Sequence, residues 1–342
     1  MAAQKNRQWT LAKRPHGEPT MENFQLVETA LPTPGPGQVL ARTLYLSLDP
    51  YMRARMDDVP SYAAPTAIGE VMTAGTVAEV IISNDPAYKP GDVVVGQGGW
   101  QEYWVLPAAE IYRAVTGPFP LSYNLGLRGM PGLTAYTGLM RIGEPKAGET
   151  VVVAAASGAV GAVVGQIAKR LGCRAVGIAG SADKCRYVTE ELGFDACLSH
   201  RSPNLTQALK EACPQGIDIY YENVGGKVFE AVLPQLNTFA RIPLCGLISY
   251  YNAASAADIA GNLMAPMLLR ELLVKRIRLQ GFIVLDTWAE MVGNFHRDMT
   301  AWGAKKPFVY AEDMTEGLEN APTAFIGMLR GQNFGKAVVK VA

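Results

Sequence analysis

Residues 150–172, TVVVAAASGAVGAVVGQIAKRLG, decide the fold of this chain. The first six residues form an apolar run typical of a buried strand, and from Gly161 the apolar residues recur at helical spacing until Gly172. Between the two lies Ala156-Ser-Gly158-Ala-Val-Gly161, a G-x-G-x-x-G pattern with alanine in place of its first glycine. The stretch therefore predicts a strand, a tight turn and a helix in direct succession.

The turn between this strand and helix has the composition of a dinucleotide-binding site. Glycine at position 158 lets the backbone approach a pyrophosphate, and glycine at position 161 lets the helix pack closely against the strand. With Ala159 and Val160 they form the start of the helix, whose N–H groups would face the phosphates. A plain strand-to-helix turn is the alternative, and the alternation that follows along the chain favours the nucleotide site.

Strands and helices alternate through the rest of this half of the chain. Five further segments have the length and composition of strands: Arg174–Ala179, Ala196–Leu198, Ile217–Tyr221, Ala240–Cys245 and Arg278–Leu285. Segments of helical spacing separate them, and Ser181 is a good N-cap for the helix after the second strand. Six alternating units predict an α/β fold, a Rossmann-type doubly wound parallel sheet with helices on both faces.

The first part of the chain has a different sequence pattern. Short β-like runs at Val39–Leu48, Thr73–Ile82 and Asp92–Val95 are separated by turns rich in proline and glycine. The chain ends in KAVVKVA, which again reads as a strand. The sequence thus predicts a mostly-β domain over residues 1–124, a nucleotide-binding domain over 125–299, and a return segment over 300–342 that completes the first domain.

Composition excludes several classes of protein. The chain has 342 residues, more than the roughly 250–300 at which a single core stops growing. With 49% hydrophobic residues and 31 basic against 31 acidic side chains, a disordered chain and a nucleic-acid binder are both disfavoured. The uncharged run Val151–Ala168 contains three glycines, a serine and a glutamine, so we expect no membrane helix there. The N-terminus lacks a secretory pattern and the five cysteines are an odd number, which together favour the cytoplasm.

The end of the second predicted strand indicates which dinucleotide binds. A carboxylate there would accept hydrogen bonds from a ribose 2′-hydroxyl and select NAD. This chain instead has Gly180 and Ser181 at that point, with Lys184 in the following helix. Ser181 can hydrogen-bond a 2′-phosphate and Lys184 can neutralise it, and a charged hydrogen bond of about 2 kcal/mol corresponds to roughly a thirty-fold preference. The sequence therefore predicts NADPH as the cofactor.

The order of the domains resembles the medium-chain dehydrogenase/reductase superfamily, which joins a mostly-β GroES-like catalytic domain to a Rossmann domain. In its zinc alcohol dehydrogenases, Cys-x-x-Asp and Gly-His-Glu motifs supply metal ligands. This chain has Leu46-Ser-Leu-Asp49 and Ile68-Gly69-Glu70 at the matching places, without the cysteine or the histidine. The five cysteines are scattered and lack C-x-x-C spacing, so we expect no metal site.

Further motifs narrow the resemblance. They are Leu48-Asp-Pro-Tyr51-Met-Arg53, Gly129-Met-Pro-Gly-Leu-Thr134-Ala-Tyr136, Tyr221-Glu-Asn223-Val-Gly-Gly226, Cys245-Gly-Leu-Ile-Ser-Tyr-Tyr251-Asn252 and Gly331-Gln-Asn333-Phe-Gly335-Lys336. Together they make the whole chain similar to the zinc-independent, NADPH-dependent alkenal/one oxidoreductases, the prostaglandin reductase group, and to its bacterial branch in particular. This resemblance implies reduction of the C=C bond of α,β-unsaturated ketones and aldehydes, with curcumin-like enones as a candidate substrate, and a homodimer.

The resemblance also implies which residues contact NADPH. Besides the glycine turn, Ser181 and Lys184, these are His200, Asn223, Cys245, Gly246, Leu247, Ile248, Ser249, Tyr250, Tyr251, Phe282, Ile283, Val284 and Asn333. The family often has tyrosine where this chain has His200, although a histidine can also stack on an adenine or hydrogen-bond a phosphate. No metal ligand is implied.

Conjugate reduction needs a donor for the carbonyl oxygen, which gains negative charge as an enolate. With no metal expected, a tyrosine hydroxyl is the appropriate group. Tyr251 is the first candidate because it follows the fifth predicted strand, at the carboxyl edge where ligands bind. Tyr51 is the second and Tyr250 the third. For each of them, ordinary packing with the hydroxyl bonded to backbone or water is the alternative. No side chain stands out as donor of the α-carbon proton, which water can supply.

Four functions remain compatible with the sequence. They are an NADPH-dependent enone reductase, an NADPH quinone reductase on the same scaffold, a zinc alcohol dehydrogenase, and a non-catalytic NADPH-binding protein. Loss of an enone chromophore, formation of a hydroquinone, bound zinc, and binding without turnover would distinguish them.

Overall fold

A computed structural model describes residues 5–254 and 264–342 of the chain. The chain divides into two compact units. The first comprises residues Met1–Gly129 and Glu312–Ala342, and the second comprises Met130–Ala311.

A six-stranded parallel sheet lies at the centre of the second unit. In spatial order its strands are β10 (Ala196–Ser199), β9 (Arg174–Ala179), β8 (Thr150–Ala154), β11 (Ile217–Tyr221), β12 (Leu236–Leu244) and β13 (Arg278–Gly281). The chain starts at β8, runs outward to β10, and then returns to the other side of β8. This order, 3-2-1-4-5-6, defines the doubly wound fold, so the predicted fold class is confirmed.

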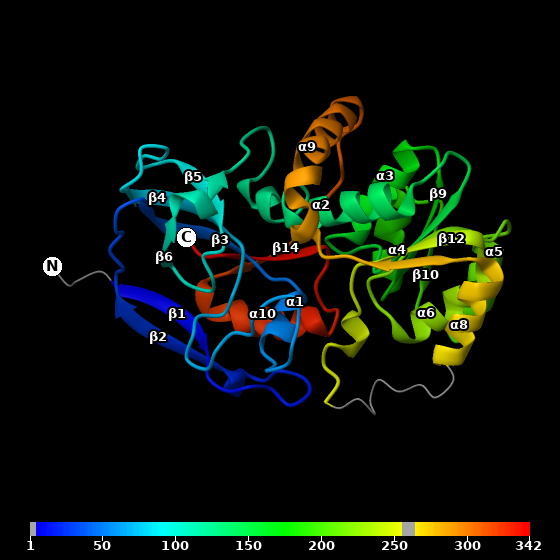
Figure 1. The fold of residues 1–342 in the computed structure, drawn as a ribbon, viewed down its shortest axis with the longest axis horizontal. Coiled ribbons are helices and arrows are strands. Elements are labelled where there is room, and N and C mark those ends of the chain that lie inside the picture. Colours follow the sequence, from blue (N-terminus) through cyan, green and yellow to red (C-terminus); the bar gives the residue numbers. More distant parts are fainter. Residues whose placement is uncertain (1–4, 255–263) are drawn as a thin grey trace. The chain divides into compact units, whose positions relative to one another are not determined.

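Helices cover both faces of this sheet. They are α2 (Met130–Thr137), α3 (Gly161–Arg170), α4 (Ala182–Arg186), α5 (Leu205–Ala212), α6 (Gly226–Val232), α8 (Met264–Lys275) and α9 (Trp288–Lys305). Val152, Ala154, Val176 and Ile178 point to the face where α5, α6 and α8 pack. Because side chains alternate along a strand, Val153 and Gly177 point to the other face. Figure 1 shows α3 on one side of the sheet and α6 and α8 on the other.

Two of the predicted strands of this sheet differ from the structure by several residues. The strand predicted to begin at Ala240 is β12, which begins at Leu236. The apolar run after Arg278 predicts a strand to Leu285, but β13 ends at Gly281 and a 3-10 turn, η8, covers Val284–Thr287. β13 lies at the edge of the sheet and pairs with β12 only, whose last residue, Leu244, is opposite Gly281. The run has strand propensity but no partner beyond that point, so this part of the prediction is wrong.

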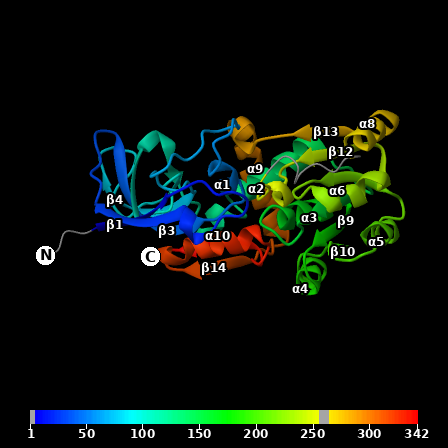
Figure 2. The ribbon, with the colours of Figure 1, turned by 90° about the horizontal axis from the view of Figure 1, so that it is seen from below.

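The first unit contains an antiparallel pair of strands and a larger mixed sheet. β1 (Lys5–Leu11) pairs with β2 (Phe24–Ala30), and the mixed sheet has the order β14 (Glu312–Glu316), β15 (Lys336–Lys340), β3 (Gln38–Ser47), β4 (Thr76–Ser83), β5 (Val93–Gly96) and β7 (Tyr112–Arg113), with β6 (Tyr103–Pro107) on β3. Among the described strands of the mixed sheet, only the β14–β15 pair is parallel. The short helix α1 spans Tyr51–Arg55 and α10 spans Ala321–Leu329. Figure 2 shows the red C-terminal segment within this unit, where β15 pairs with β3.

Aromatic side chains join the two ends of the chain in the core of the first unit. The ring of Trp100 stacks on Phe24 at 5.6 Å between centroids and meets Phe325 of α10 edge-on at 5.5 Å. The indole N–H of Trp9 donates to the carbonyl of Leu318 at 2.9 Å. The C-terminal segment is therefore part of this core.

The units do not divide at the predicted positions 124/125 and 299/300. Residues 125–129 stay with the first unit because the 3-10 turn η3 (Leu121–Leu125) is fixed there by Asn124, whose side chain bonds both the N–H and the carbonyl of Val115. Residues 300–311 stay with the second because α9 continues to Lys305, and Gln166 of α3 then bonds the backbone of Val309.

No helix within residues 5–254 and 264–342 is long and apolar enough to cross a membrane. The uncharged run Val151–Ala168 forms most of β8, the turn after it and most of α3.

Candidate functional site

The turn between β8 and α3 is built so that a glycine is required at its last position. A Cβ on Gly161 would lie 2.4 Å from the carbonyl oxygen of Ala155, and a Cβ on Gly158 would lie 3.2 Å from the same oxygen. Ala155 itself has a positive φ of 52°, and its carbonyl accepts the N–H of Gly158 at 2.9 Å. The helix therefore begins directly against the end of the strand, with its first N–H groups at the edge of the sheet.

The second strand ends beside a group of polar and basic side chains. Ser181 caps α4, since its hydroxyl oxygen accepts the N–H of Lys184 at 3.3 Å. The N–H of His200, which follows β10, donates to the carbonyl of Ala179 at 3.0 Å. A Cβ on Gly180 would lie 3.3 Å from Nε2 of His200, so the imidazole extends over this glycine. The structure thus brings Ser181, Lys184 and His200 to one place, with Arg201 next to them in the chain.

The electrostatics of this group favour an anion. Loss of water around the imidazole lowers the pKa of His200, and the positive charges of Arg201 and Lys184 lower it further. An added anion would reverse the two charge effects, because it would stabilise the protonated imidazole. No acidic residue follows β9 directly; Asp183, in α4, is paired with Arg186.

A buried carboxylate shapes the turn after β11. Glu222 is fully buried, and one carboxylate oxygen accepts the N–H groups of Val224 at 2.6 Å and Gly225 at 2.9 Å. The other oxygen accepts the hydroxyl of Tyr220 at 3.0 Å. Burial raises the pKa of Glu222, while these donors lower it. The next residue, Asn223, donates its amide to the carbonyl of Ala154 at 2.8 Å, which ties this turn to the end of β8.

The same turn holds the segment that follows β12. The N–H groups of Ile248 and Ser249 donate to the carbonyls of Asn223 and Val224 at 3.2 and 3.0 Å. The hydroxyl of Tyr250 in turn accepts the N–H of Gly226 at 2.9 Å. The positions of residues 245–251 are therefore set by the turn that Glu222 organises.

Tyr251 folds back over the start of its own segment. Its hydroxyl oxygen accepts the N–H of Leu247 at 3.3 Å, and a Cβ on Gly246 would lie 3.1 Å from the same oxygen. Glycine at 246 therefore makes room for the phenol. A phenol hydroxyl can both accept and donate a hydrogen bond, so accepting this one is compatible with a donor role.

Buried side chains pack around the carboxyl ends of β11 and β12. The hydroxyl of Tyr221 donates to the carbonyl of Thr134 at 2.7 Å and also contacts the thiol of Cys245. Burial raises the pKa of Cys245 to about 12, so this thiol stays protonated at neutral pH. The ring of Phe282 meets Tyr221 edge-on at 6.5 Å between centroids.

Most predicted site residues follow strands of the one parallel sheet. The glycine turn follows β8, Ser181 and Lys184 follow β9, and His200 follows β10. Asn223 follows β11, residues 245–251 follow β12, and residues 282–284 follow β13. Parallel strands end at the same edge, so these segments lie along one edge of the second unit.

Two predicted site residues lie in the first unit. The hydroxyl of Tyr51, at the start of α1, is hydrogen-bonded to Thr73, and burial together with the nearby charge of Asp49 raises its pKa. Asn333 precedes β15, and its amide donates to the carbonyl of Gly335 at 2.8 Å.

Two residues that shape this site are not among the candidates that the sequence predicts. One is Glu222, whose signal was an acidic residue directly after the apolar strand IDIYY. The other is Tyr310, whose hydroxyl donates to the carbonyl of Ala159 in the glycine turn at 3.3 Å. Nothing in the local sequence indicates this second contact, because 151 positions separate its partners.

No three His, Cys, Asp or Glu side chains are grouped to hold a metal ion in the part of the chain that the structure describes. At the position that matches a metal-binding cysteine, Leu46 is buried in the apolar core. The carboxylate of Asp49 forms an ion pair with Lys336, whose ammonium lies 3.0 Å away. These residues do not fit a zinc ion.

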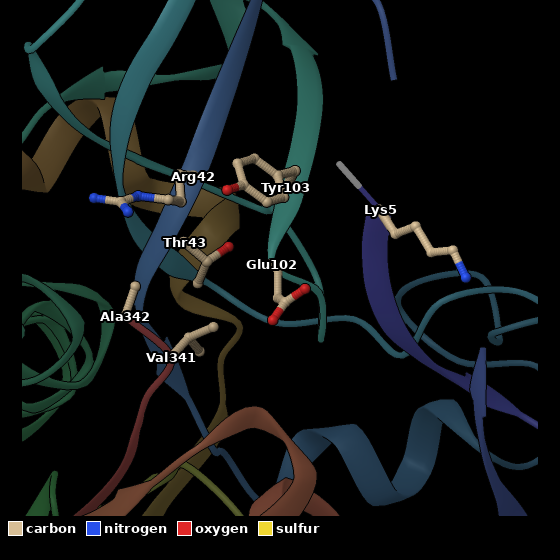
Figure 3. A pocket seen from close by; sticks show the side chains of 7 residues that line it. All are labelled: Lys5, Arg42, Thr43, Glu102, Tyr103, Val341 and Ala342. Atoms are coloured by element: carbon tan, nitrogen blue, oxygen red, sulfur yellow. The ribbon is translucent and has the colours of Figure 1, made fainter. Parts of the chain in front are cut away.

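A polar hollow of about 260 Å³ lies in the first unit, lined by Lys5, Arg42, Thr43, Glu102, Tyr103, Val341 and Ala342 (Figure 3). Its charged residues are used in ion pairs: Lys5 with Glu28, Arg42 with Glu79, and Glu102 with Arg7. None of the predicted site residues lines it.

The doubly wound sheet and the glycine turn after its first strand define the nucleotide-binding class of oxidoreductases. Two family descriptions match the chain: "N-terminal domain of oxidoreductase" over residues 7–114 and "Zinc-binding dehydrogenase" over residues 159–297. The second name includes zinc, which Leu46 and Asp49, at the positions matching metal ligands, do not fit.

Curated relatives and a solved structure match nearly the whole chain. The NADPH-dependent curcumin reductase of Escherichia coli is 56% identical over 339 residues, 99% of this chain and 98% of that protein. Prostaglandin reductase 1 of Bos taurus is 40% identical over 97% of this chain and 98% of its own length. The crystal structure of CurA from Vibrio vulnificus in complex with NADPH superposes with a TM-score of 0.94, at 52% identity, covering 98% of this chain and 99% of that one. The chain belongs to the medium-chain dehydrogenase/reductase family, in the group of these reductases.

Proposed function

We propose that this protein reduces the C=C bond of α,β-unsaturated ketones and aldehydes with NADPH, and that curcumin-like enones are among its substrates. The observation that carries the proposal is the 56% identity, over 99% of the chain, with a protein named NADPH-dependent curcumin reductase. The geometry at the edge of the parallel sheet supports it.

The second unit has residues that fit each part of the cofactor. The glycine turn, Gly158 to Gly161, leaves no space for side chains at its end and is the proposed pyrophosphate site. Asn223, residues 245–251 and residues 282–284 follow the strands on the nicotinamide side of the sheet. Asn333 is the proposed contact from the first unit. This set of contacts is an assignment on the family pattern and on position in the fold.

The group at the ends of β9 and β10 supports NADPH over NADH. Ser181 supplies a hydroxyl, Lys184 a positive charge, and His200 a ring that gains a proton more readily beside an anion. A 2′-phosphate is the part of the cofactor that needs such a site, and no carboxylate directly follows β9 to bind a 2′-hydroxyl.

NADPH, when bound, supplies the hydride that the β-carbon of the enone accepts. The chain must then stabilise the negative charge that develops on the carbonyl oxygen. We propose that the hydroxyl of Tyr251 donates a hydrogen bond to this oxygen, with Tyr51 and Tyr250 as the second and third candidates. In the structure the hydroxyl of Tyr250 accepts the N–H of Gly226, which favours a structural role for that residue. The proton for the α-carbon comes from water in this proposal.

A panel of substrates with product identification tests the function. Enals, enones, quinones and alcohols are incubated with the purified protein and either NADPH or NADH. We expect oxidation of NADPH with enones, loss of the enone chromophore, and a saturated ketone as the product. A hydroquinone as the only product, zinc-dependent alcohol oxidation, or binding without turnover would each overturn the proposal.

We also propose that the protein is a cytoplasmic homodimer. Among the described residues, β13 pairs with β12 alone, and Phe239, Leu269 and Leu273 of the same unit are between 62% and 78% exposed. All five cysteines are unpaired, as in a reducing compartment. Light scattering coupled to size exclusion measures the oligomeric state, and cell fractionation tests the location.

A further inference from the structure

The segment that leaves α9, residues 306–311, is fastened to α3, and the proposed function gives it no role. The guanidinium of Arg170, at the end of α3, donates to the carbonyls of Lys306 and Pro307 at 2.9 and 3.2 Å. The same guanidinium lies over the ring of Phe308, 3.7 Å from its centre. The first half of the segment is therefore held by a single arginine of α3.

The second half of the segment is held at two backbone positions. The side-chain amide of Gln166, in α3, donates to the carbonyl of Val309 at 2.8 Å and accepts its N–H at 2.9 Å. The N–H of Ala311 donates to the hydroxyl of Tyr187, the first residue of η5 (Tyr187–Glu191), at 3.0 Å. Tyr310 lies between these two fixed positions and is buried. Its phenol is therefore held in place from both sides.

The hydroxyl of Tyr310 takes the place of a helical donor at the start of α3. It donates to the carbonyl of Ala159 at 3.3 Å. In a regular α-helix this carbonyl would accept the N–H of Val163, four residues further on. That N–H instead donates to the carbonyl of Val160 at 3.0 Å. The carbonyl of Ala159 is thus turned from the helical pattern towards the phenol.

This bond sets the direction of an N–H group in the glycine turn. The carbonyl of Ala159 and the N–H of Val160 belong to one planar trans peptide, so they point to opposite sides. Holding the carbonyl therefore fixes the direction of the N–H. Within the described residues, the N–H groups of Ala159, Val160 and Gly161 have no acceptor in the chain. N–H groups in this position bind anions such as a pyrophosphate.

We propose that Tyr310 is a positioning residue for the pyrophosphate of the cofactor. Its hydroxyl holds the peptide between Ala159 and Val160 in the orientation that presents the N–H of Val160 to a phosphate oxygen. The inference rests on the proposed function, in which the glycine turn is the pyrophosphate site. Tyr310 acts through this peptide, so its effect extends to every ligand that carries the pyrophosphate.

The variant Tyr310→Phe removes the hydroxyl and keeps the ring. We expect the dissociation constants of NADPH and NADH to rise together by about five-fold, the equivalent of one hydrogen bond. Adenosine 2′-phosphate has the 2′-phosphate but no pyrophosphate, so its dissociation constant should stay within two-fold of the native value. Loss of the charge at Lys184 would have the opposite pattern, because it would spare NADH.

Fluorescence titration measures the binding of NADPH and NADH, and calorimetry measures that of adenosine 2′-phosphate. Tyr187→Phe is the matched control, because it removes a hydroxyl that holds the same segment at Ala311 and keeps the phenol of Tyr310. All three dissociation constants of this control should stay within two-fold of native. Urea unfolding, together with native binding of adenosine 2′-phosphate, shows that each variant is folded.

Three results would overturn the inference while the native protein binds NADPH. One is native affinity of Tyr310→Phe for NADPH and NADH. Another is an equal loss for adenosine 2′-phosphate, which would mean a general loosening of the second unit. The third is the same loss in Tyr187→Phe, which would assign the effect to the segment and not to the bond with Ala159. If the native protein does not bind NADPH, the proposed function itself fails, and this inference fails with it.

Discussion

The hydroxyl of Tyr251 is the group on which the proposed chemistry depends most. Tyr251→Phe removes the donor and keeps the ring, and it also removes the bond that the hydroxyl accepts from the N–H of Leu247. Loss of one donor to a developing oxyanion costs about 3 kcal/mol, so we expect kcat on enones to fall by at least about ten-fold and up to 10³-fold. NADPH affinity, measured by fluorescence titration, is expected to change little.

Two further tyrosines make this result interpretable. Tyr51→Phe tests the second candidate donor in the same assay, and Tyr112→Phe, at an exposed position of β7, is the control. Unchanged turnover in Tyr251→Phe together with a large loss in Tyr51→Phe would transfer the role to Tyr51.

Lys184 determines cofactor choice in the proposed site. Lys184→Ala removes a positive charge from the group that contains Ser181 and His200, so NADPH binding is expected to weaken by about thirty-fold, the equivalent of about 2 kcal/mol. NADH, which has no 2′-phosphate, should bind the variant about as well as the native protein. Lys210→Ala, at an exposed lysine of α5, is the matched control. Equal losses for both cofactors in Lys184→Ala would contradict the 2′-phosphate role.

At the scale of elements, the glycine at the start of α3 is in a much closer environment than Gly293 of α9. A Cβ on Gly161 would lie 2.4 Å from the Ala155 carbonyl oxygen, whereas one on Gly293 of α9 would meet nothing within 4 Å. Gly161→Ala is expected to destabilise the protein by about 1–3 kcal/mol and to weaken NADPH binding, because the turn must shift. Gly293→Ala should stabilise it by about 0.5–1 kcal/mol. Urea unfolding of both variants checks this; similar effects of the two would refute a close approach at Gly161.

The turn after β11 gives a dependence of stability on pH. Burial raises the pKa of Glu222 in the folded protein above its ordinary value of 4.5. Between the ordinary pKa and the raised pKa, the folded state therefore binds more protons than the unfolded state. Stability from this group is present at low pH and is lost as the pH rises through that window. Glutamine does not titrate, and its carbonyl oxygen can accept the N–H groups of Val224 and Gly225. We expect the free energy of unfolding of the native protein, relative to Glu222→Gln, to fall as the pH rises from about 4.5.

Urea unfolding of both proteins at a series of pH values from 4.5 to 8 measures this difference. A difference that is constant over the range, or that increases with pH, would show that burial does not control the ionisation of Glu222.

The elements that the sequence predicts well are those with a strong local pattern. β9 and β11 were predicted to the residue and Ser181 was predicted as a cap, because apolar runs and capping side chains act within a few positions. The end of β13 was not predicted correctly, because this strand ends at Gly281, opposite the last residue of its partner β12. Glu222 was missed because its acceptor role appears only once the turn brings its partners together. Local patterns therefore place the site residues on elements, but tertiary contacts fix their environment.

At the scale of the whole molecule, the first unit is made from two separate parts of the chain. β15 pairs with β3, and Lys336 of β15 reaches the turn after β3 with its ammonium. There it donates to the carbonyl of Leu48 and lies 3.0 Å from a carboxylate oxygen of Asp49. The side chain of Lys336 is almost completely buried, and these two oxygens are hydrogen-bond partners of its ammonium. The sequence predicted the return of the chain to this unit, but not the buried ion pair that fixes it.

Substitution within β15 tests how much this pair contributes. Lys336→Met leaves the charge of Asp49 buried without its partner, and breaking a buried pair in this way costs about 3–5 kcal/mol. Lys340→Met is a matched control, because Lys340 lies in the same strand and pairs with Glu316, yet its side chain is 42% exposed and that of Glu316 is 71% exposed. Exposed pairs of this kind contribute about 0–1 kcal/mol. Urea unfolding, followed by the fluorescence of the buried Trp9 and Trp100, compares the two variants. If Lys336→Met were no more destabilising than Lys340→Met, closure of the first unit would depend on strand pairing and apolar packing, and the Asp49–Lys336 pair would be dispensable.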